Sequence, residues 1–204
     1  MKIDIIVFDG HDELDVFGPY EIMRAAELRK ADLNPRLVTR LPQETVTAQY
    51  GTKYKPDGVY EPGHADLLLV PGGGWGARSE RGTWGEVRRG DWAPILRNAA
   101  ERGTIMASVC AGAMLLAHAG VIGPRRAATH HAAWDDLIGT GARLVPDRVV
   151  DDGDLITCGG VTSGIDLALW LVEKYVSREM ADAIAETLEY PNRARPKSFV
   201  QPAR

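Results

Sequence analysis

The chain has few cysteines and no long hydrophobic run. Its 204 residues include only two cysteines, Cys110 and Cys158, which is too few for a disulfide-stabilised scaffold. The N-terminal apolar run, Lys2 to Phe8, is too short for a signal peptide, and an acidic stretch follows it. Nowhere does an apolar run approach the roughly 20 residues that span a bilayer. We therefore expect a soluble, cytoplasmic protein with no membrane partner.

A concentrated basic charge is absent as well. The formal net charge is −4 at pH 7, and basic residues form no run longer than a pair such as Arg125-Arg126. Because general nucleic-acid binders carry a strongly basic patch, we expect no nucleic-acid partner. His11, His64 and His118 show none of the spacings that are typical of zinc ligands. A small-molecule ligand is therefore the expected partner.

What the chain does contain is a series of short apolar runs that alternate with amphipathic segments. Runs such as Lys2 to Phe8 are typical of parallel strands that are covered on both faces. Alternating strands and helices predict an α/β fold, in which a parallel sheet has helices on both faces. We expect one domain over residues 1–193 and a surface tail over residues 194–204.

The expected boundaries follow from this pattern and from glycine and proline positions. Pro19 is placed in the first turn of a helix that ends near Leu28, and residues 75–90 are expected to form a polar loop anchored by Trp84. A single strand is expected over Arg143 to Val150. The other expected strands are Arg36 to Arg40, Asp66 to Val70, Thr104 to Ser108 and Asp154 to Cys158, with a short extended segment over Arg126 to Thr129 and a β excursion over Glu44 to Tyr54. The other expected helices are Asp91 to Arg102, Ala111 to Ala119, a segment opened by His130, Val161 to Val176, and one that ends near Glu189.

The segment from Gly103 to Gly120 carries the clearest chemical signal. An apolar strand stops there at Cys110, and a helix of small residues starts immediately afterwards. The backbone must therefore reverse sharply, as it does in the nucleophile elbow of hydrolases. Because the helix dipole and unpaired N–H groups favour a thiolate, we predict a reactive Cys110 with a lowered pKa. The alternative is a buried, inert thiol that serves as a small hydrophobic side chain.

Several polar or glycine-rich positions also follow strand ends. Asp15, Gly72 to Gly74 and Thr129-His130 all come after predicted strands, as Cys110 does. Ligands bind outside the carboxyl ends of the strands in open α/β sheets, so these residues are expected to share one site. The glycines allow close backbone approach and leave N–H groups free, but their spacing matches neither phosphate-binding motif. Asp15 has a second interpretation as a helix cap.

Taken together, several motifs resemble those of the ThiJ/PfpI superfamily and occur in the order found there. They are Leu14-Asp15-Val-Phe-Gly18-Pro19, Leu69-Val70-Pro71-Gly72-Gly73-Gly74, Ser108-Val109-Cys110-Ala111-Gly112-Ala113, Ala128-Thr129-His130, Thr157 to Asp166, and Leu188-Glu189-Tyr190. The pattern is most similar to the isocyanide hydratase branch, and it also resembles the ligand domains of AraC-type regulators. The resemblance implies a flavodoxin-like fold related to class I glutamine amidotransferases, a homodimer, Cys110 as nucleophile with Asp15 beside it, and no metal or organic cofactor.

Two positions separate the branches of this superfamily. Deglycating and glyoxalase members usually carry glutamate at the acidic position, so Asp15 favours the isocyanide hydratase branch. Protease-like members place histidine after the cysteine and isocyanide hydratases commonly place threonine, whereas this chain has Ala111. Glu13 misses the motif register, and we expect it to be a solvated loop charge.

The expected chemistry is nucleophilic attack by Cys110 on a small electrophilic carbon, with Asp15 relaying the proton. The backbone N–H groups of Gly73 and Ala111 are expected to stabilise developing negative charge. The expected reaction is hydration of an isocyanide to an N-formamide. The alternatives are a non-enzymatic redox sensor, a regulatory ligand-binding domain without a helix-turn-helix, and a glyoxalase, deglycase or amidase. Further pocket residues are expected to be Gly72, Gly74, Thr129, His130, Trp75 and Tyr20, whereas Cys158 is expected to be buried and inert.

Overall fold

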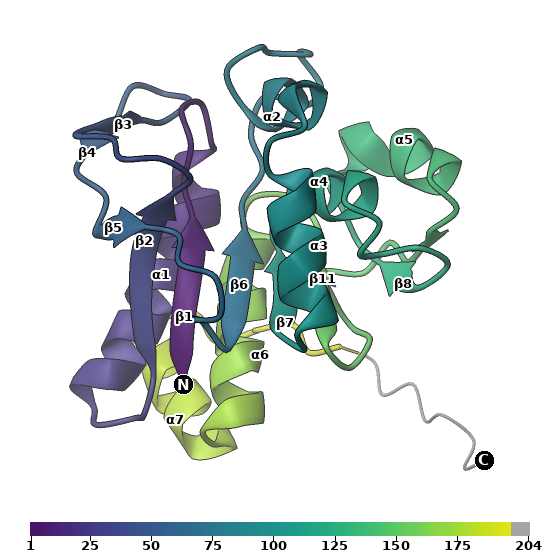
Figure 1. The fold of residues 1–204 in the computed structure, drawn as a ribbon. Coiled ribbons are helices and arrows are strands. Elements are labelled where there is room, and N and C mark those ends of the chain that lie inside the picture. Colours follow the sequence, from purple (N-terminus) through teal and green to yellow (C-terminus); the bar gives the residue numbers. More distant parts are fainter. Residues whose placement is uncertain (197–204) are drawn as a thin grey trace.

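A seven-stranded sheet forms the centre of the molecule (Figure 1). The computed structural model describes residues 1–196. Its strands, in spatial order, are β10 (Val149–Asp151), β11 (Leu155–Cys158), β7 (Ile105–Ser108), β6 (Leu67–Val70), β1 (Lys2–Ile6), β2 (Asn34–Thr39) and β5 (Gly58–Val59). β10 pairs antiparallel with β11, and every other neighbouring pair in this sheet is parallel. The predicted parallel sheet is therefore confirmed.

Helices cover both faces of this sheet (Figure 1). On one face, α1 (Glu13–Leu28) packs against α6 (Ser163–Tyr175) and α7 (Arg178–Thr187). On the other face, α4 (Gly112–His118) packs against α2 (Thr83–Arg89) and α3 (Ala93–Glu101). The arrangement is the predicted α/β architecture, and it brings the loops after β1, β6 and β7 to one end of the sheet.

Two small sheets and a short helical segment lie outside the central sheet. β3 (Val46–Thr47) and β4 (Lys53–Tyr54) form an antiparallel hairpin, which confirms the predicted β excursion. β8 (Arg126–Ala127) pairs in parallel with β9 (Arg143–Leu144). Between these two strands, the 3₁₀ helix η1 (His131–Ala133) leads directly into α5 (Trp134–Gly139). The hairpin and the β8–β9 segment are the peripheral elements that bear on the site described below.

The central strands are buried because both faces of the sheet are covered. Ile3, Ile5 and Ile6 of β1 and all four residues of β6 are buried. This explains why these strands appear in the sequence as continuous apolar runs rather than as alternating apolar and polar residues.

Helix α1 begins earlier than the sequence predicted. Asp12 is its N-cap, and the Asp12 carboxylate accepts a hydrogen bond from Leu14 N at 3.0 Å. Pro19 therefore lies inside the helix, where it has no N–H to donate to the Asp15 carbonyl. The prediction placed the start at Pro19 because proline is favoured in the first turn. Asp15 is consequently a residue of the first helical turn, and the alternative in which Asp15 caps the helix is wrong.

Two further predictions of secondary structure were wrong. Residues 75–90 contain α2, which ends where Gly90 adopts a left-handed conformation with φ of 74°. The Thr83–Arg89 helix has no side-chain cap and begins after Gly82 at φ of 127°, so the usual N-terminal signal is missing. The strand expected over Arg143 to Val150 is divided into β9 and β10, which belong to different sheets. Pro146 lies between them, and proline does not donate a ladder hydrogen bond.

The start of the expected surface tail is held against the body of the protein. Ala194 N donates to the buried Asp166 carboxylate at 2.6 Å, and Arg195 Nε donates to Glu173 at 2.8 Å. The remainder of the tail, residues 197–204, lies outside the described residues.

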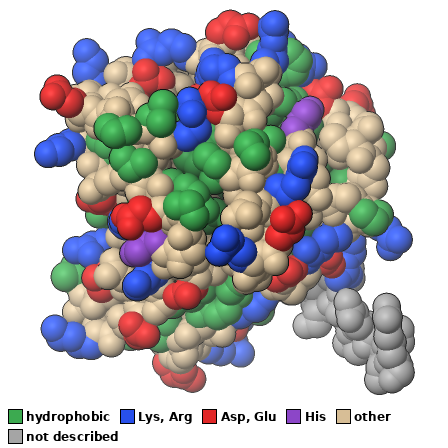
Figure 2. All heavy atoms as spheres, in the orientation of Figure 1, with side chains coloured by type: hydrophobic (Ala, Val, Ile, Leu, Met, Phe, Trp, Pro, Cys, Tyr) green, Lys and Arg blue, Asp and Glu red, His purple; other side chains and the backbone are tan. Residues whose placement is uncertain are grey.

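On the face drawn in Figure 2, basic and acidic side chains are interspersed rather than separated by sign. None of the helices within residues 1–196 is long and apolar enough to cross a membrane.

Candidate active site

Cys110 lies at the apex of the predicted sharp turn between β7 and α4. Its φ is 56°, in the left-handed region that residues other than glycine rarely adopt. Two hydrogen bonds hold this conformation: Cys110 N donates to the Gly159 carbonyl at 3.0 Å, and Thr129 Oγ1 donates to the Cys110 carbonyl at 2.9 Å. Thr129 therefore supports the backbone of the elbow rather than facing a ligand.

Glycine is required around this elbow because two backbone segments approach closely. A Cβ on Gly112 would lie 2.1 Å from the Val70 carbonyl oxygen, and a Cβ on Gly72 would lie 2.6 Å from Ala111 N. Both distances are far below normal contact. The loop after β6 is thus pressed against the start of α4, and only glycines at these two positions permit that packing.

Asp15 lies next to the cysteine side chain. The same Cβ on Gly72 would be 3.0 Å from Asp15 Oδ2 and 3.1 Å from Cys110 Cβ, so the carboxyl and the thiol-bearing side chain flank one glycine. Gly72 N donates to Asp15 Oδ2 at 2.8 Å. The second carboxyl oxygen, Asp15 Oδ1, is buried and accepts no hydrogen bond from a nitrogen or oxygen of the described residues. The predicted proximity of Asp15 and Cys110 is therefore present in the fold.

The Asp15 carboxyl holds its proton more firmly than an ordinary aspartate. Burial raises its pKa well above 3.8, and the negative charge of Asp12 adds to this effect. The hydrogen bonds from Gly72 N and from the Cys110 thiol oppose the increase in pKa. Because each group disfavours ionisation of the other, Asp15 and Cys110 together retain at least one proton near neutral pH.

The Cys110 thiol differs from the sequence prediction. Its pKa is raised, first by burial and second by the negative charge of Asp15, although the N–H groups of Val161 and Ala111 favour the thiolate. The prediction of a lowered pKa relied on the N-terminus of α4. That helix has only seven residues, and its dipole does not compensate for the loss of hydration. Ionisation of Cys110 therefore requires a nearby proton acceptor.

A cavity of about 210 Å³ opens at this position. Six of the predicted site residues line it: Gly73, Gly74, Trp75, Cys110, Ala111 and His130. The other lining residues are Asp12, Gln49, Tyr50, Gly76, Ala77 and Val161. Asp15 and Gly72 lie behind Cys110, outside the lining.

Tyr20 was assigned to the pocket incorrectly. It does not line the cavity, and the charges that influence its phenol belong to Asp57, Arg24 and Glu27. The assignment rested only on the proximity of Tyr20 to the expected site in the sequence. Because α1 begins six residues before Pro19, Tyr20 is instead carried along the helix and away from the strand ends.

Gln49 and Tyr50 reach the cavity from the β3–β4 hairpin, and no motif in the sequence predicted that they would. The Glu13 carboxylate accepts hydrogen bonds from Tyr50 N at 2.9 Å and Thr52 N at 3.3 Å. Gln49 N also donates to the His11 carbonyl at 2.8 Å. Glu13 is therefore a clamp for this hairpin rather than a solvated loop charge. The Glu13 carboxylate and the His11 carbonyl meet the hairpin only in the folded protein, so no local motif predicts these contacts.

Trp75 forms another wall of the cavity and is fixed from outside it. Its indole Nε1 donates to Asp136 Oδ2 at 2.7 Å, and its ring meets the edge of Trp84 with centroids 5.1 Å apart. Arg78 Nη1 also donates to Asp136, at 3.0 Å. Trp84 thus anchors this segment, as predicted, through an aromatic contact.

His130 is positioned as a neutral, structural side chain. Its Nδ1 accepts a hydrogen bond from Ala132 N at 3.1 Å and caps η1. Burial lowers its pKa, and the adjacent His131 ring adds to this effect. A Cβ on Gly160 would lie 2.5 Å from the His130 ring, so the ring rests directly on that glycine.

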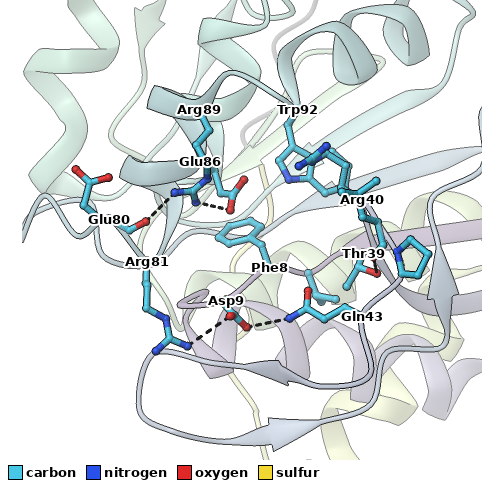
Figure 3. A pocket seen from close by; sticks show the side chains of 13 residues that line it. Phe8, Asp9, Thr39, Arg40, Gln43, Glu80, Arg81, Glu86, Arg89 and Trp92 are labelled. Carbon is cyan, nitrogen blue, oxygen red and sulfur yellow. Dashed lines mark hydrogen bonds and ion pairs between the residues drawn. The ribbon is translucent and has the colours of Figure 1, made fainter.

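A second, larger cavity of about 380 Å³ lies beside the carboxyl ends of β1 and β2 (Figure 3). Its charged side chains are largely paired with one another. Arg89 contacts Glu86 at 2.6 Å and Arg81 contacts Asp9 at 3.5 Å. No cysteine is among its lining residues in the described part of the chain. Of these two cavities, Cys110 therefore lines only the smaller one.

Residues 1–174 match the DJ-1/PfpI family, and this range includes both Asp15 and Cys110. The chain belongs to the DJ-1/PfpI family. Isonitrile hydratase from Pseudomonas putida is 33% identical over 93% of this chain and 78% of that enzyme. A deglycase from Pyrococcus horikoshii is 26% identical over 85% of this chain and 96% of the deglycase. The family resemblance inferred from the motifs is confirmed.

Solved structures show that the DJ-1/PfpI fold extends over nearly the whole chain. A ThiJ/PfpI family protein from Pseudomonas syringae has a TM-score of 0.79 and 24% identity, over 98% of this chain and 78% of that protein. An AraC family transcriptional regulator from Pseudomonas putida has a TM-score of 0.78 and 20% identity, over 92% and 98%. These likenesses confirm the flavodoxin-like α/β fold.

Proposed function

We propose that this DJ-1/PfpI protein is a cysteine-dependent hydratase, which converts a small isocyanide and water to an N-substituted formamide. The observation that carries the proposal is the pairing of Cys110 with the buried carboxyl of Asp15 behind a cavity of about 210 Å³. The identity of 33% to isonitrile hydratase supports the same reaction.

In the first half of the reaction, Asp15 transfers the thiol proton. Its carboxylate accepts the proton of Cys110 while Sγ forms a bond with the terminal carbon of the isocyanide. Asp15 then donates this proton to the same carbon, which gives a covalent thioimidate. A carboxyl whose pKa is raised by burial suits both steps, because it takes up the thiol proton more readily than an ordinary aspartate does and can then return it.

In the second half, water resolves the intermediate. The water oxygen forms a bond with the thioimidate carbon, and one water proton goes to the substrate nitrogen. The C–S bond then breaks, the second water proton returns to the sulfur through Asp15, and the formamide leaves with Cys110 regenerated. The sum of both halves is one isocyanide and one water consumed for each formamide formed.

Backbone N–H groups stabilise the charge that develops at the reacting centre. Among the described residues, no backbone carbonyl accepts from Gly73 N, which lines the cavity. Ala111 N faces the Cys110 sulfur. Because Ala111 has no hydroxyl or imidazole, these N–H groups replace the side-chain donor that relatives place after the cysteine. Each such donor contributes about 3 kcal/mol in comparable sites.

The test is formation of formamide from methyl isocyanide and from a bulkier alkyl isocyanide, followed by NMR. Wild-type protein is expected to turn over the substrate, and Cys110→Ala is expected to be inactive. Cys158→Ala is the matched control, because Cys158 is buried and lies outside the cavity lining. Equal, slow hydration by wild type and Cys110→Ala would refute the proposal.

A glyoxalase or deglycase reaction is the second candidate, and the deglycase relative supports it. The same thiol would add to a carbonyl carbon and give a hemithioacetal. Consumption of methylglyoxal by the wild type, without formamide production from isocyanides, would favour this candidate. The redox-sensor alternative is less well supported, because the thiolate is the form that peroxide oxidises and burial disfavours it here.

A further inference from the structure

Asp12 places a carboxylate on the wall of the catalytic cavity. The residue lines the cavity and is 7% exposed. Its backbone N donates to the Gly72 carbonyl at 2.9 Å, and its Oδ1 accepts from Leu14 N at 3.0 Å. These bonds fix the carboxylate at the N-terminus of α1. Its charge contributes to the raised pKa of both Asp15 and Cys110, so it lies within electrostatic reach of the reacting groups.

No positive side chain balances this charge within the cavity. Among the lining residues of the described chain, Asp12 is the only one with an ionic side chain other than the neutral His130. Arg78 follows the lining residue Ala77, but its guanidinium pairs with Asp136 at 3.0 Å and lies over the Trp84 ring at 4.1 Å. The cavity therefore presents a net negative charge to an entering molecule.

We propose that Asp12 is a specificity-determining residue, which selects neutral or cationic electrophiles and excludes those that carry a carboxylate. This selection of electrophiles by charge depends on the proposed function in one respect, namely that an electrophile must reach Cys110. An anionic substrate would approach a fixed carboxylate with no cation to offset the repulsion. A neutral isocyanide or a substrate with an ammonium group would not meet this barrier.

The test compares two alkylating reagents that differ in charge, iodoacetamide and iodoacetate. In both cases Sγ displaces iodide and forms a thioether. The rate of labelling of Cys110 is measured by mass spectrometry of its peptide, and the ratio of the two rates is normalised to the ratio for a free thiol. Any change in the pKa of Cys110 affects both reagents equally and cancels in this ratio.

Asp12→Asn is the informative variant, because asparagine retains the helix-capping hydrogen bond while it removes the charge. We expect the normalised preference for iodoacetamide to fall about fivefold in Asp12→Asn, which corresponds to two unit charges about 4 Å apart in water. Glu44→Gln is the matched control: it removes one charge from an exposed position outside the cavity, and its ratio is expected to equal that of wild type.

The wild-type protein supplies a second measurement that does not depend on a variant. Raising the ionic strength from about 0.01 M to about 1 M shortens the screening length from roughly 30 Å to 3 Å. Iodoacetate labelling of Cys110 should therefore accelerate by a larger factor than the reaction of iodoacetate with a free thiol, while iodoacetamide labelling should not accelerate. An unchanged ratio in Asp12→Asn, no salt effect, or failure of both reagents to label Cys110 would overturn the proposal. Because the test measures labelling of Cys110 rather than turnover, its result would hold even if the protein proved not to be a hydratase.

Discussion

The packing of Gly112 against β6 allows a quantitative prediction about the stability of the elbow. In Gly112→Ala, the new Cβ would lie 2.1 Å from the Val70 carbonyl oxygen, whereas ordinary contact begins near 3.4 Å. Helix α4 and the end of β6 must therefore separate by about 1.3 Å, the difference between these distances. The same carbonyl accepts from Val109 N at 3.0 Å, so this movement also strains the bond that holds β7 to β6 just before Cys110.

The expected cost combines overpacking with the weakened hydrogen bond. Overpacking a buried site costs about 1–3 kcal/mol, and a net backbone hydrogen bond contributes about 1 kcal/mol. We expect the free energy of unfolding to fall by about 2–4 kcal/mol and Tm to fall by roughly 5–15 °C. Because Cys110 is displaced together with α4, labelling of its thiol should change as well.

Urea denaturation and calorimetry provide the measurement, and Gly139→Ala is the matched control. Gly139 is also helical, but a Cβ there would meet no atom within 4 Å. That variant should be as stable as wild type or more stable by about 0.4–1 kcal/mol. If Gly112→Ala unfolded with the same free energy as Gly139→Ala, the close approach of α4 to β6 would not exist in solution.

Three further substitutions test the site. Asp15→Asn should reduce turnover by about 10²–10⁴. Because the pKa of Asp15 is raised in the folded state, folding takes up a proton and wild-type stability falls as pH rises above 3.8, so the variant should be more stable than wild type at pH 7 and lose that gain near pH 4. Denaturation midpoints that are equal for the variant and wild type at both pH values would contradict the raised pKa. Glu13→Ala should raise KM about fivefold with little change in kcat, because it removes the hydrogen bonds that hold the hairpin carrying Tyr50. Glu21→Ala, on the exposed side of the same helix, is the control and should leave KM unchanged. Thr129→Val should lower the free energy of unfolding by about 1–3 kcal/mol, because it leaves the buried Cys110 carbonyl unpaired. The control is Thr140→Val, whose hydroxyl donates at an exposed helix end. If both variants lost the same small amount of stability, the Thr129 hydrogen bond would not hold the elbow.

The main elements of the fold were predictable because strands that are buried on both faces of the sheet consist of continuous apolar residues. The apolar runs that became β1, β6 and β7 are recognisable without neighbours, and so is the sharp turn at Cys110. The start of α1 was misplaced for a local reason, since Pro19 and Asp12 are both common at helix starts and only the fold shows which one is used. Helix α2 was missed because its N-terminus has no side-chain cap.

The order of strands and helices, the elbow and the proximity of Asp15 and Cys110 could be predicted from the chain, because they depend on local composition and on the shared carboxyl edge of a parallel sheet. The ionisation of the pair could not be predicted in this way, since the pKa of Cys110 depends on how completely α1, the Gly72 loop and α4 exclude water. The tertiary structure also decided the walls of the cavity. Tyr50 and Asp12 come from segments separated along the chain, and the contacts that bring them to one cavity are set by packing rather than by neighbouring residues.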